Sequence, residues 1–377
     1  MDAGARRTRD GFGEIEAKVR SGERLSREDG LALYDCDDLA WLGGLAHEVR
    51  TRENGDVVHF SVNRQLTVGA DEAAGPAQGQ GLAQDLGGEH LTELRVLDAP
   101  RPGVPWDHYP RALRELRAAL PETVALQAFT ATAIHHFEKV SGRDAGDLLD
   151  ELIDAGLESL TGGGAAIFDG EVRQHLVDHD THWEDWSRIH RLAHEKGLKT
   201  PCTMLYGHIE EPRHRVDHVL RLRELQDETG GFEVFAPLRY QHADEGSAAF
   251  GGGEIRDVLP DHAPSATGAE ALKTFAVSRL LFDNVPHVKV VWARHGVQTA
   301  QIALLHGADD MDGPVVEHAD AHAADAGTPD ALTRDDLLDL IRDAGFRPVE
   351  RNARYETLRE YEGLDPLRRE SPQPMRL

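Results

Sequence analysis

The stretch Val57-Val58-His59-Phe60-Ser61-Val62 decides the fold, because it is a short apolar run with the β-branched content of a buried strand. It ends at Asn63-Arg64 and opens a long loop, residues 68–90. The side chains of that loop are small and polar, and they bury too little apolar area to offset the entropy of ordering them. We therefore expect a strand that leads into a flexible loop at the mouth of a barrel.

Similar apolar runs recur along the chain and are separated by segments with helical spacing. The predicted strands are residues 57–62, 94–97, 124–129, 157–160, 199–205, 232–238, 288–292 and 302–306. The predicted helices between them include residues 109–120, 145–155, 183–196 and 212–229. Eight parallel strands that alternate with helices close a barrel, so the sequence predicts an α/β fold, a (β/α)8 TIM-type barrel.

The remaining segments divide the chain. Residues 1–56 are predicted to form an N-terminal helical extension, with Ser26 as a helix cap. The barrel spans residues 57–313 and contains a Gly-bearing polar insertion at 241–267, which we expect to be a mobile loop. Residues 314–377 are predicted to hold a capped amphipathic helix at 333–344 and a loose tail.

Composition limits the classes of partner. The chain has 67 acidic and 41 basic residues, a net charge of -26, which disfavours contact with nucleic acid or with anionic lipid. No run of apolar residues is long enough to span a membrane, and the N-terminus lacks the apolar core of a signal peptide. We expect a cytoplasmic protein with no nucleic-acid or membrane partner, and a homodimer is left open.

Cysteine and histidine spacing predicts no metal site. Cys36 and Cys202 are far apart and form no CxxC pair, which argues against a disulfide framework or a thiolate site. Two histidine pairs, His190 with His194 and His214 with His218, would each share a helical face. Neither pair has a third ligand at metal spacing.

Polar residues follow the predicted strands, where the loops of a barrel converge and its chemistry gathers. We assign catalytic roles to His208, Tyr206 and Arg64, cofactor binding to Gly162, Gly163, Gly164 and Thr130, and substrate binding to Arg239, Asn63 and Asp309. The three glycines would let backbone N–H groups approach a carboxylate, although they also suit a tight strand-to-helix turn. A histidine in the position of His208 suits acid–base chemistry, although a structural hydrogen bond is the commoner role.

From about residue 25 to 355 the chain resembles the aminofutalosine (aminodeoxyfutalosine) synthases of menaquinone biosynthesis, a radical S-adenosylmethionine family. The resemblance rests on several words of sequence, among them Val62-Asn63-Arg64, Gly156 to Ala165, Met204 to Glu210 and Gly307 to Gly313. It implies a barrel of the radical S-adenosylmethionine kind with a four-iron cluster and S-adenosylmethionine as cofactors. It also implies addition of the 5'-deoxyadenosyl radical to 3-[(1-carboxyvinyl)oxy]benzoate.

The chain departs from the family where that chemistry is done. The family's CxxxCxxC is absent from the loop at 68–90, and Gln127, Ala133 and Ala166 replace polar or charged family residues. We therefore predict no cofactor for the chain as it stands and leave its enzymatic activity uncertain. One hypothesis is a synthase-like protein of the futalosine route whose loop reflects an error in the sequence. The alternative is a cluster-free paralogue, a pseudoenzyme that binds a small anionic or adenosyl-like molecule, regulates, acts as a scaffold or catalyses non-radical chemistry.

Overall fold

The computed structural model describes residues 3–66, 91–96, 104–177, 181–241, 258–259, 265–316 and 331–361. The predicted loop at 68–90, most of the predicted insertion at 241–267 and the end of the predicted tail lie outside the described residues. The strands are β1 (Val57–Phe60), β2 (Asn63–Leu66), β3 (Glu93–Val96), β4 (Ala125–Thr130), β5 (Ser159–Thr161), β6 (Thr200–Tyr206), β7 (Phe232–Arg239), β8 (His287–Val291), β9 (Asp310–Asp312), β10 (Val315–Val316), β11 (Leu332–Thr333), β12 (Arg347–Arg351) and β13 (Thr357–Glu360).

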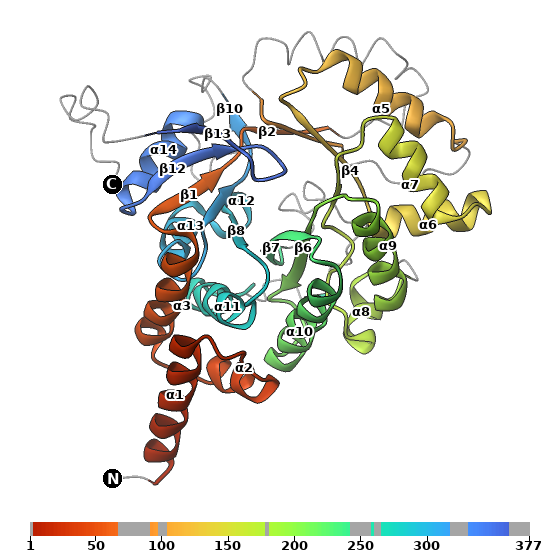
Figure 1. Ribbon diagram of the computed structural model, residues 1–377. Coiled ribbons are helices and arrows are strands. Elements are labelled where there is room, and N and C mark those ends of the chain that lie inside the picture. The colour runs from red at the N-terminus through yellow and green to blue at the C-terminus, as the bar shows by residue number, and fades with distance from the viewer. Residues whose placement is uncertain are drawn as a thin grey trace, which may run out of the picture.

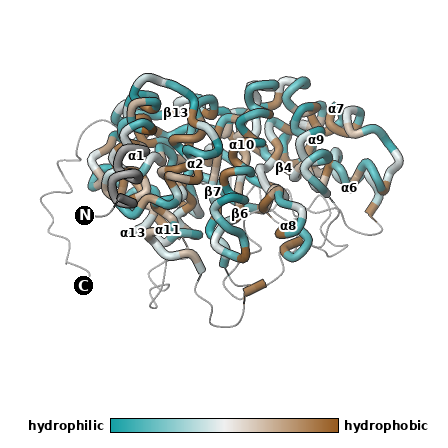
Figure 2. The backbone as a smooth tube through the Cα atoms, turned by 90° about the horizontal axis from the view of Figure 1, so that it is seen from below, coloured by the Kyte–Doolittle hydropathy of each residue, from teal (hydrophilic) through white to brown (hydrophobic). Residues whose placement is uncertain are grey.

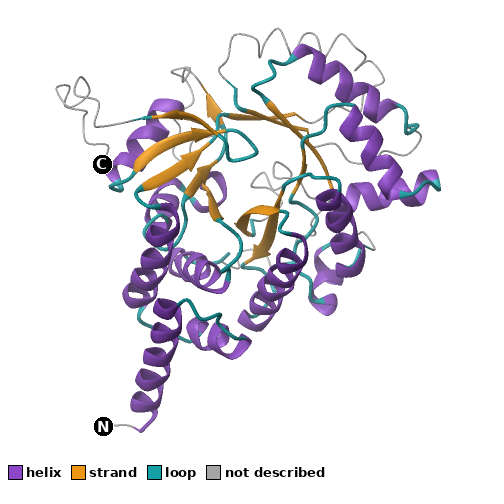
Figure 3. Ribbon diagram, viewed as in Figure 1, coloured by secondary structure: helices purple, strands orange, loops and turns teal. Residues whose placement is uncertain are grey.

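Two curved sheets surround one interior (Figure 3). The larger sheet has the order β13-β12-β1-β9-β8-β7-β6, and the smaller has the order β2-β3-β4-β5. They join at one seam because β1 and β2 are consecutive pieces of one extended segment, of which β1 pairs with β9 and β2 with β3. At the other seam, Ser159 Oγ donates a hydrogen bond to the Lys199 carbonyl at 2.7 Å. The pairs from β2 to β5 and from β6 through β9 to β1 are parallel, which confirms the predicted barrel.

Helices cover the outside of the barrel (Figure 1). They are α1 (Ala3–Ser21), α2 (Arg27–Tyr34), α3 (Leu39–Asn54), α5 (His108–Ala119), α6 (Ala131–Ser141), α7 (Ala145–Asp154), α8 (Gly170–Leu176), α9 (Trp183–Glu195), α10 (Pro212–Thr229), α11 (Gly268–Leu281), α12 (Trp292–His295), α13 (Val297–Ala303) and α14 (Arg334–Asp343). Figure 2 shows brown and teal segments alternating along these helices, as expected when one face packs on the sheet and the other faces water.

Helix starts follow the capping chemistry read from the sequence. Ser26 Oγ accepts from the Asp29 amide at 3.2 Å, and the Asp29 carboxylate accepts from the Ser26 amide at 2.8 Å, so the predicted cap is a complete capping box. Thr333 and Asp336 form the same motif at the start of α14. Among the described residues, no helix is both long and apolar enough to cross a bilayer.

The last predicted strand is wrong. Residues 302–306 form the end of α13 and the turn that follows it, and the eighth barrel strand is β9. Ala300, Ala303 and Leu304 are fully buried, whereas Ile302 is 45% exposed, so the burial follows a helical period. A short apolar run alone does not distinguish the two periods.

The C-terminal segment is part of the barrel sheet. Strand β12 pairs in parallel with β1, register Val57 to Arg347 through Phe60 to Glu350, and β13 returns antiparallel to β12. The sequence analysis placed residues 314–377 outside the barrel, whereas β12 belongs to the barrel sheet. It also assigned residues 359–360 to a loose tail, but residues 359–360 are the end of β13. As a result, the turn between β12 and β13 lies against the interior of the barrel.

Candidate functional site

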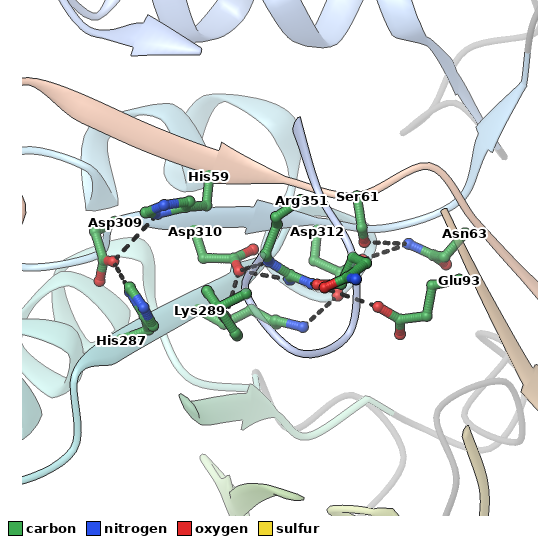
Figure 4. A network of polar contacts seen from close by, with 12 residues as sticks. His59, Ser61, Asn63, Glu93, His287, Lys289, Asp309, Asp310, Asp312 and Arg351 are labelled. Atoms are coloured by element: carbon green, nitrogen blue, oxygen red, sulfur yellow. Dashed lines mark hydrogen bonds and ion pairs between the residues drawn. The ribbon is translucent and has the colours of Figure 1, made fainter. Parts of the chain in front are cut away.

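The interior of the barrel contains a network of buried charges (Figure 4). Asp312, at the end of β9, accepts hydrogen bonds from Asn63 Nδ2 at 2.6 Å, Lys289 Nζ at 2.7 Å and Arg95 Nη2 at 2.5 Å. Burial acts to raise the pKa of Asp312, but the charges of Arg95, Lys289 and Arg351 outweigh it and hold the pKa well below the usual range. Asp312 is therefore an ionised centre that three strands share.

The turn after β12 completes the network. Arg351 Nε donates to Asp310 Oδ2 at 2.7 Å, and the hydroxyl of Tyr355 donates to the same oxygen. Arg351 Nη1 lies 3.4 Å from Glu93, which also pairs with Arg95. Three carboxylates, Glu93, Asp310 and Asp312, thus face three cations, Arg95, Lys289 and Arg351. The charges in these ion pairs balance, although Asp310 Oδ1 is buried and accepts no hydrogen bond among the described residues.

His295 and Tyr206 form a hydrogen-bonded pair of neutral side chains at the C-terminal ends of the strands. His295 Nδ1 donates to the Val291 carbonyl at 2.9 Å, which leaves Nε2 to accept from the Tyr206 hydroxyl at 3.1 Å. Burial lowers the pKa of His295 to about 4 and raises the pKa of Tyr206. Both groups are consequently neutral near pH 7, and the phenol is held in one direction.

Arg239 ends β7 beside this pair. Its Nε–H is buried and has no hydrogen-bond acceptor among the described residues. Arg239 is the partner of Tyr206 in the parallel register of β6 and β7. A buried donor without an acceptor is costly. An incoming carboxylate would remove that cost, so Arg239 is the predicted residue with the clearest unused binding capacity.

His208, which was predicted to be an acid or base, is engaged by contacts within its own turn. Its side chain is fully buried, with Nε2 donating to the Leu205 carbonyl at 3.0 Å and Nδ1 lying 2.9 Å from Glu210. The Glu210 carboxylate also accepts from the Gly207 amide at 2.6 Å and from Arg215 Nε at 2.7 Å. Burial acts to raise the pKa of Glu210, but these partners lower it to about 2. His208 therefore holds the turn after β6.

The triple glycine also has a structural role. A Cβ on Gly162 would lie 2.9 Å from the Pro201 carbonyl oxygen, and one on Gly164, whose φ is +78°, would lie 2.3 Å from Thr132 Oγ1. The carbonyl of Gly164 accepts from Arg173 Nη2 at 2.7 Å, and that of Gly163 accepts from Trp186 Nε1 at 3.4 Å. Close packing thus requires glycine at position 162, and close packing with a left-handed turn requires it at position 164.

The other predicted site residues are engaged or lie elsewhere. Thr130 Oγ1 caps α6 by accepting from the Ala133 amide at 3.0 Å, and Arg64 donates to the Val315 carbonyl. Asn63 is committed to Asp312. Asp309 is not at the mouth, since it precedes β9 and lies at the N-terminal end of the barrel. Asp309 was predicted to lie at the mouth because residues 302–306 were wrongly predicted to be the strand before it.

Several residues of the network were not assigned a site role from the sequence. Lys289, Glu93 and Arg95 lie within strands rather than after them, and Arg351 and Tyr355 come from a segment assigned to the C-terminal helix and tail. His295 offered a usable signal, because it follows the predicted strand at 288–292, where polar side chains gather.

One cavity of about 390 Å³ lies outside the barrel, between the segment after α2 and the first turns of α10 and α11. Its lining includes Tyr34, Arg215, Glu270 and Lys273. Arg215 lies between this cavity and the barrel, with its guanidinium carbon 5.8 Å from the Tyr34 ring centroid and 5.2 Å from that of Tyr206. Arg215 therefore lies close both to this cavity and to Tyr206 at the end of β6.

Known proteins were compared with this chain. It is 69% identical over 397 residues to aminodeoxyfutalosine synthase of Streptomyces coelicolor, with 100% of both chains covered. The chain belongs to the aminodeoxyfutalosine synthase family. The corresponding Thermus thermophilus enzyme is 38% identical over 93% of this chain and 97% of that one. Residues 231–363 match the CofH/MqnC C-terminal region. The fold is also that of methylornithine synthase (PylB), with TM-score 0.64 and 12% identity over 89% of this chain and 97% of the other.

A second structural relative supports the same fold. The maturase HydG of the [FeFe]-hydrogenase has TM-score 0.64 and 13% identity, and the match covers 92% of this chain and 77% of the other. The chain is thus an α/β barrel of the aminodeoxyfutalosine synthase family. The alternative of a regulatory or scaffold protein gains no support from these relatives.

The prediction of no cofactor is wrong, because the 69% identical relative is a radical S-adenosylmethionine enzyme, which needs a four-iron cluster and S-adenosylmethionine. In the family, cysteine thiolates hold such a cluster. This sequence has two cysteines, Cys36 after α2 and Cys202 within β6, and both are buried. They do not fit a three-thiolate site. The described residues therefore assign no ligand set to the cluster.

Proposed function

We propose that this chain serves the aminodeoxyfutalosine synthase step of the futalosine route and that its barrel binds the anionic aromatic substrate of that step. The 69% identity over the full length of both chains carries the proposal. The substrate class implied by the family, an aryl enolpyruvyl ether with carboxylates, matches the donors at the ends of β6 to β8.

Arg239 is the proposed carboxylate clamp. Its buried Nε–H lacks an acceptor among the described residues, and guanidinium forks bind carboxylates with two parallel hydrogen bonds. Tyr206, whose hydroxyl donates to His295, is the proposed neutral packing surface beside that carboxylate. The interior network around Asp312 closes the bottom of the site with paired charges, which keeps the anion near Arg239.

Calorimetry with 3-[(1-carboxyvinyl)oxy]benzoate tests the proposal. A hydrogen bond to a charged group contributes about 1.5–3 kcal/mol, so Arg239→Ala should weaken binding roughly 10- to 100-fold. Arg239→Lys keeps the charge but loses the forked pair of donors. Its affinity for the substrate should therefore lie between those of the wild type and Arg239→Ala. Arg191→Ala, which removes a surface arginine paired with Glu228, is the matched control and should bind like the wild type.

Binding weaker than about 1 mM in the wild type, or equal binding by Arg239→Ala, would refute the proposal. Anaerobic incubation with iron, sulfide, reductant and S-adenosylmethionine, followed by mass spectrometry for aminodeoxyfutalosine, measures turnover in the same preparation. Product would also show that the cluster is held by groups other than three cysteines of this chain.

A further inference from the structure

Three potential metal ligands converge at the N-terminal end of the barrel, away from the proposed substrate position. They are His59 on β1, His287 at the start of β8 and Asp309 just before β9 (Figure 4). One ligand atom from each lies within 4.8 Å of the other two. No spacing in the sequence indicates this group, because 228 residues separate His59 from His287.

We propose that His59, His287 and Asp309 bind one divalent first-row transition metal ion, for which Zn²⁺ is the probe. Two imidazole nitrogens and a carboxylate oxygen are a donor set that such ions prefer, and they leave a position for water. This site is independent of the proposed function, since it lies at the opposite end of the strands.

The distances suit an ion after small side-chain movements. Asp309 Oδ2 lies 2.6 Å from His287 Nδ1 and 3.9 Å from His59 Nδ1. Bonds of about 2.0–2.2 Å in a tetrahedral arrangement place ligand atoms roughly 3.3 Å apart, between these two values. A His287 ring whose proton is on Nε2 presents the Nδ1 lone pair to the ion.

His59 provides the observation that most favours a ligand. Its Nδ1 is buried and has no hydrogen-bond partner among the described residues, although it faces the carboxylate. At 3.9 Å the contact with Asp309 is too long for a hydrogen bond. An ion between the three side chains would satisfy this nitrogen and join β1, β8 and β9.

The surrounding residues orient the carboxylate and one ring. Asp309 Oδ1 accepts from the Val288 amide at 2.8 Å and from Arg279, which leaves Oδ2 directed at the histidines. Tyr355 stacks on His287 with ring centroids 3.9 Å apart and planes 5° apart. Second contacts of this kind fix metal ligands in place. The Arg279 charge weakens the attraction for a cation, whereas the net charge of -26 favours it.

The histidine pairs noted in the sequence do not form such a site. His190 and His194 both contact Thr200 Oγ1, at 3.0 and 2.9 Å, and they pack around Phe232. His214 lies 3.9 Å from Asp169, has a side chain 13% exposed and has no third ligand in the part of the chain that the structure describes. It matches His59 in distance to a carboxylate and His287 in exposure, so His214 is a suitable control.

The test is zinc binding to the full-length protein by calorimetry and elemental analysis. We expect one equivalent of Zn²⁺, at least roughly tenfold weaker binding in His59→Gln and in His287→Gln, and unchanged binding in His214→Gln. Zinc should raise the melting temperature of the wild type and of His214→Gln only. Wild-type binding weaker than about 10 μM, or full affinity in His59→Gln or His287→Gln, would overturn the proposal.

X-ray absorption of the zinc-loaded wild type keeps the test independent of the folding of the variants. Scattering from two imidazoles and an oxygen is expected. A sulfur neighbour, or no imidazole, would place the zinc elsewhere and reject the site.

Discussion

Lys289 and Asp312 form an ion pair inside the barrel with an N–O distance of 2.7 Å, and the Asp312 side chain has no exposed surface. On the outside, Lys196 and Asp150 form a pair with the same distance, with side chains 23% and 60% exposed. The two pairs differ in burial, which governs what each contributes to stability.

Lys289→Met should therefore lower the free energy of unfolding by about 3–5 kcal/mol, because it leaves a buried carboxylate short of one partner. Lys196→Met should change it by less than about 1 kcal/mol. Urea denaturation followed by circular dichroism measures both. Equal effects would mean that Arg95 and Arg351 compensate fully for the missing ammonium.

Glu210 should make stability pH-dependent in acid. Its folded pKa of about 2 lies below the ordinary 4.5, so its contribution is present above pH 4.5 and is lost as pH falls toward 2. The shift corresponds to roughly 3 kcal/mol at pH 7. The facing groups are His208, Arg215 and the Gly207 amide, and Glu270 shares Arg215.

The measurement is the difference in unfolding free energy between wild type and Glu210→Gln at pH 7 and pH 3. We expect the wild-type advantage to shrink by more than half at pH 3, following the linkage relation. An advantage that does not depend on pH would assign the effect to packing.

Both cysteines should react slowly in the native protein. Cys36 and Cys202 are 1% and 0% exposed, and burial raises the pKa of each thiol. A chromogenic thiol reagent should react roughly 100-fold faster with the urea-unfolded chain than with the native one, because only the thiolate attacks. If one thiol per chain reacted as fast in native buffer as in urea, the prediction would be contradicted.

Gly164→Ala should be more damaging than Gly197→Ala. Both glycines have positive φ, +78° and +86°, but a Cβ on Gly197 meets nothing within 4 Å, whereas one on Gly164 meets Thr132. Backbone strain alone costs about 1–2 kcal/mol, and overpacking adds about 1–3 kcal/mol. Thermal unfolding measures the loss of stability in each single variant. The double variant Gly164→Ala/Thr132→Ala should recover the part of that loss that comes from overpacking against Thr132.

The barrel could be predicted because its strands and helices have clear periods and its strands end in polar residues. Seven of the predicted strands overlap observed ones, and the helix starts at Ser26 and Thr333 follow local capping. The error at 302–306 arose where a short amphipathic helix has the composition of a strand. Strand β12 was missed because Arg347, Glu350 and Arg351 give it a charged pattern. In the fold, Arg351 pairs with interior carboxylates, whereas Arg347 pairs with Asp56 and Glu360 at the surface.

The site was predicted less well for a related reason. Position after a strand identifies residues near the mouth, and Tyr206 and Arg239 were found in this way. It does not reveal whether a side chain is already engaged, as His208, Thr130 and Asn63 are. It also cannot bring His59 and His287 together, since their contact depends on the closed barrel.

The position of β12 affects the order in which the protein can be completed. Strand β1 is synthesised near the beginning of the chain, and its neighbour β12 comes nearly 300 residues later. Until Arg351 and Tyr355 leave the ribosome, Asp310 lacks its ion-pair and hydrogen-bond partners, and Glu93 has only Arg95 among the described residues. Nascent barrels should therefore stay open and exposed to chaperones until β12 and the turn after it dock against β1 and the interior.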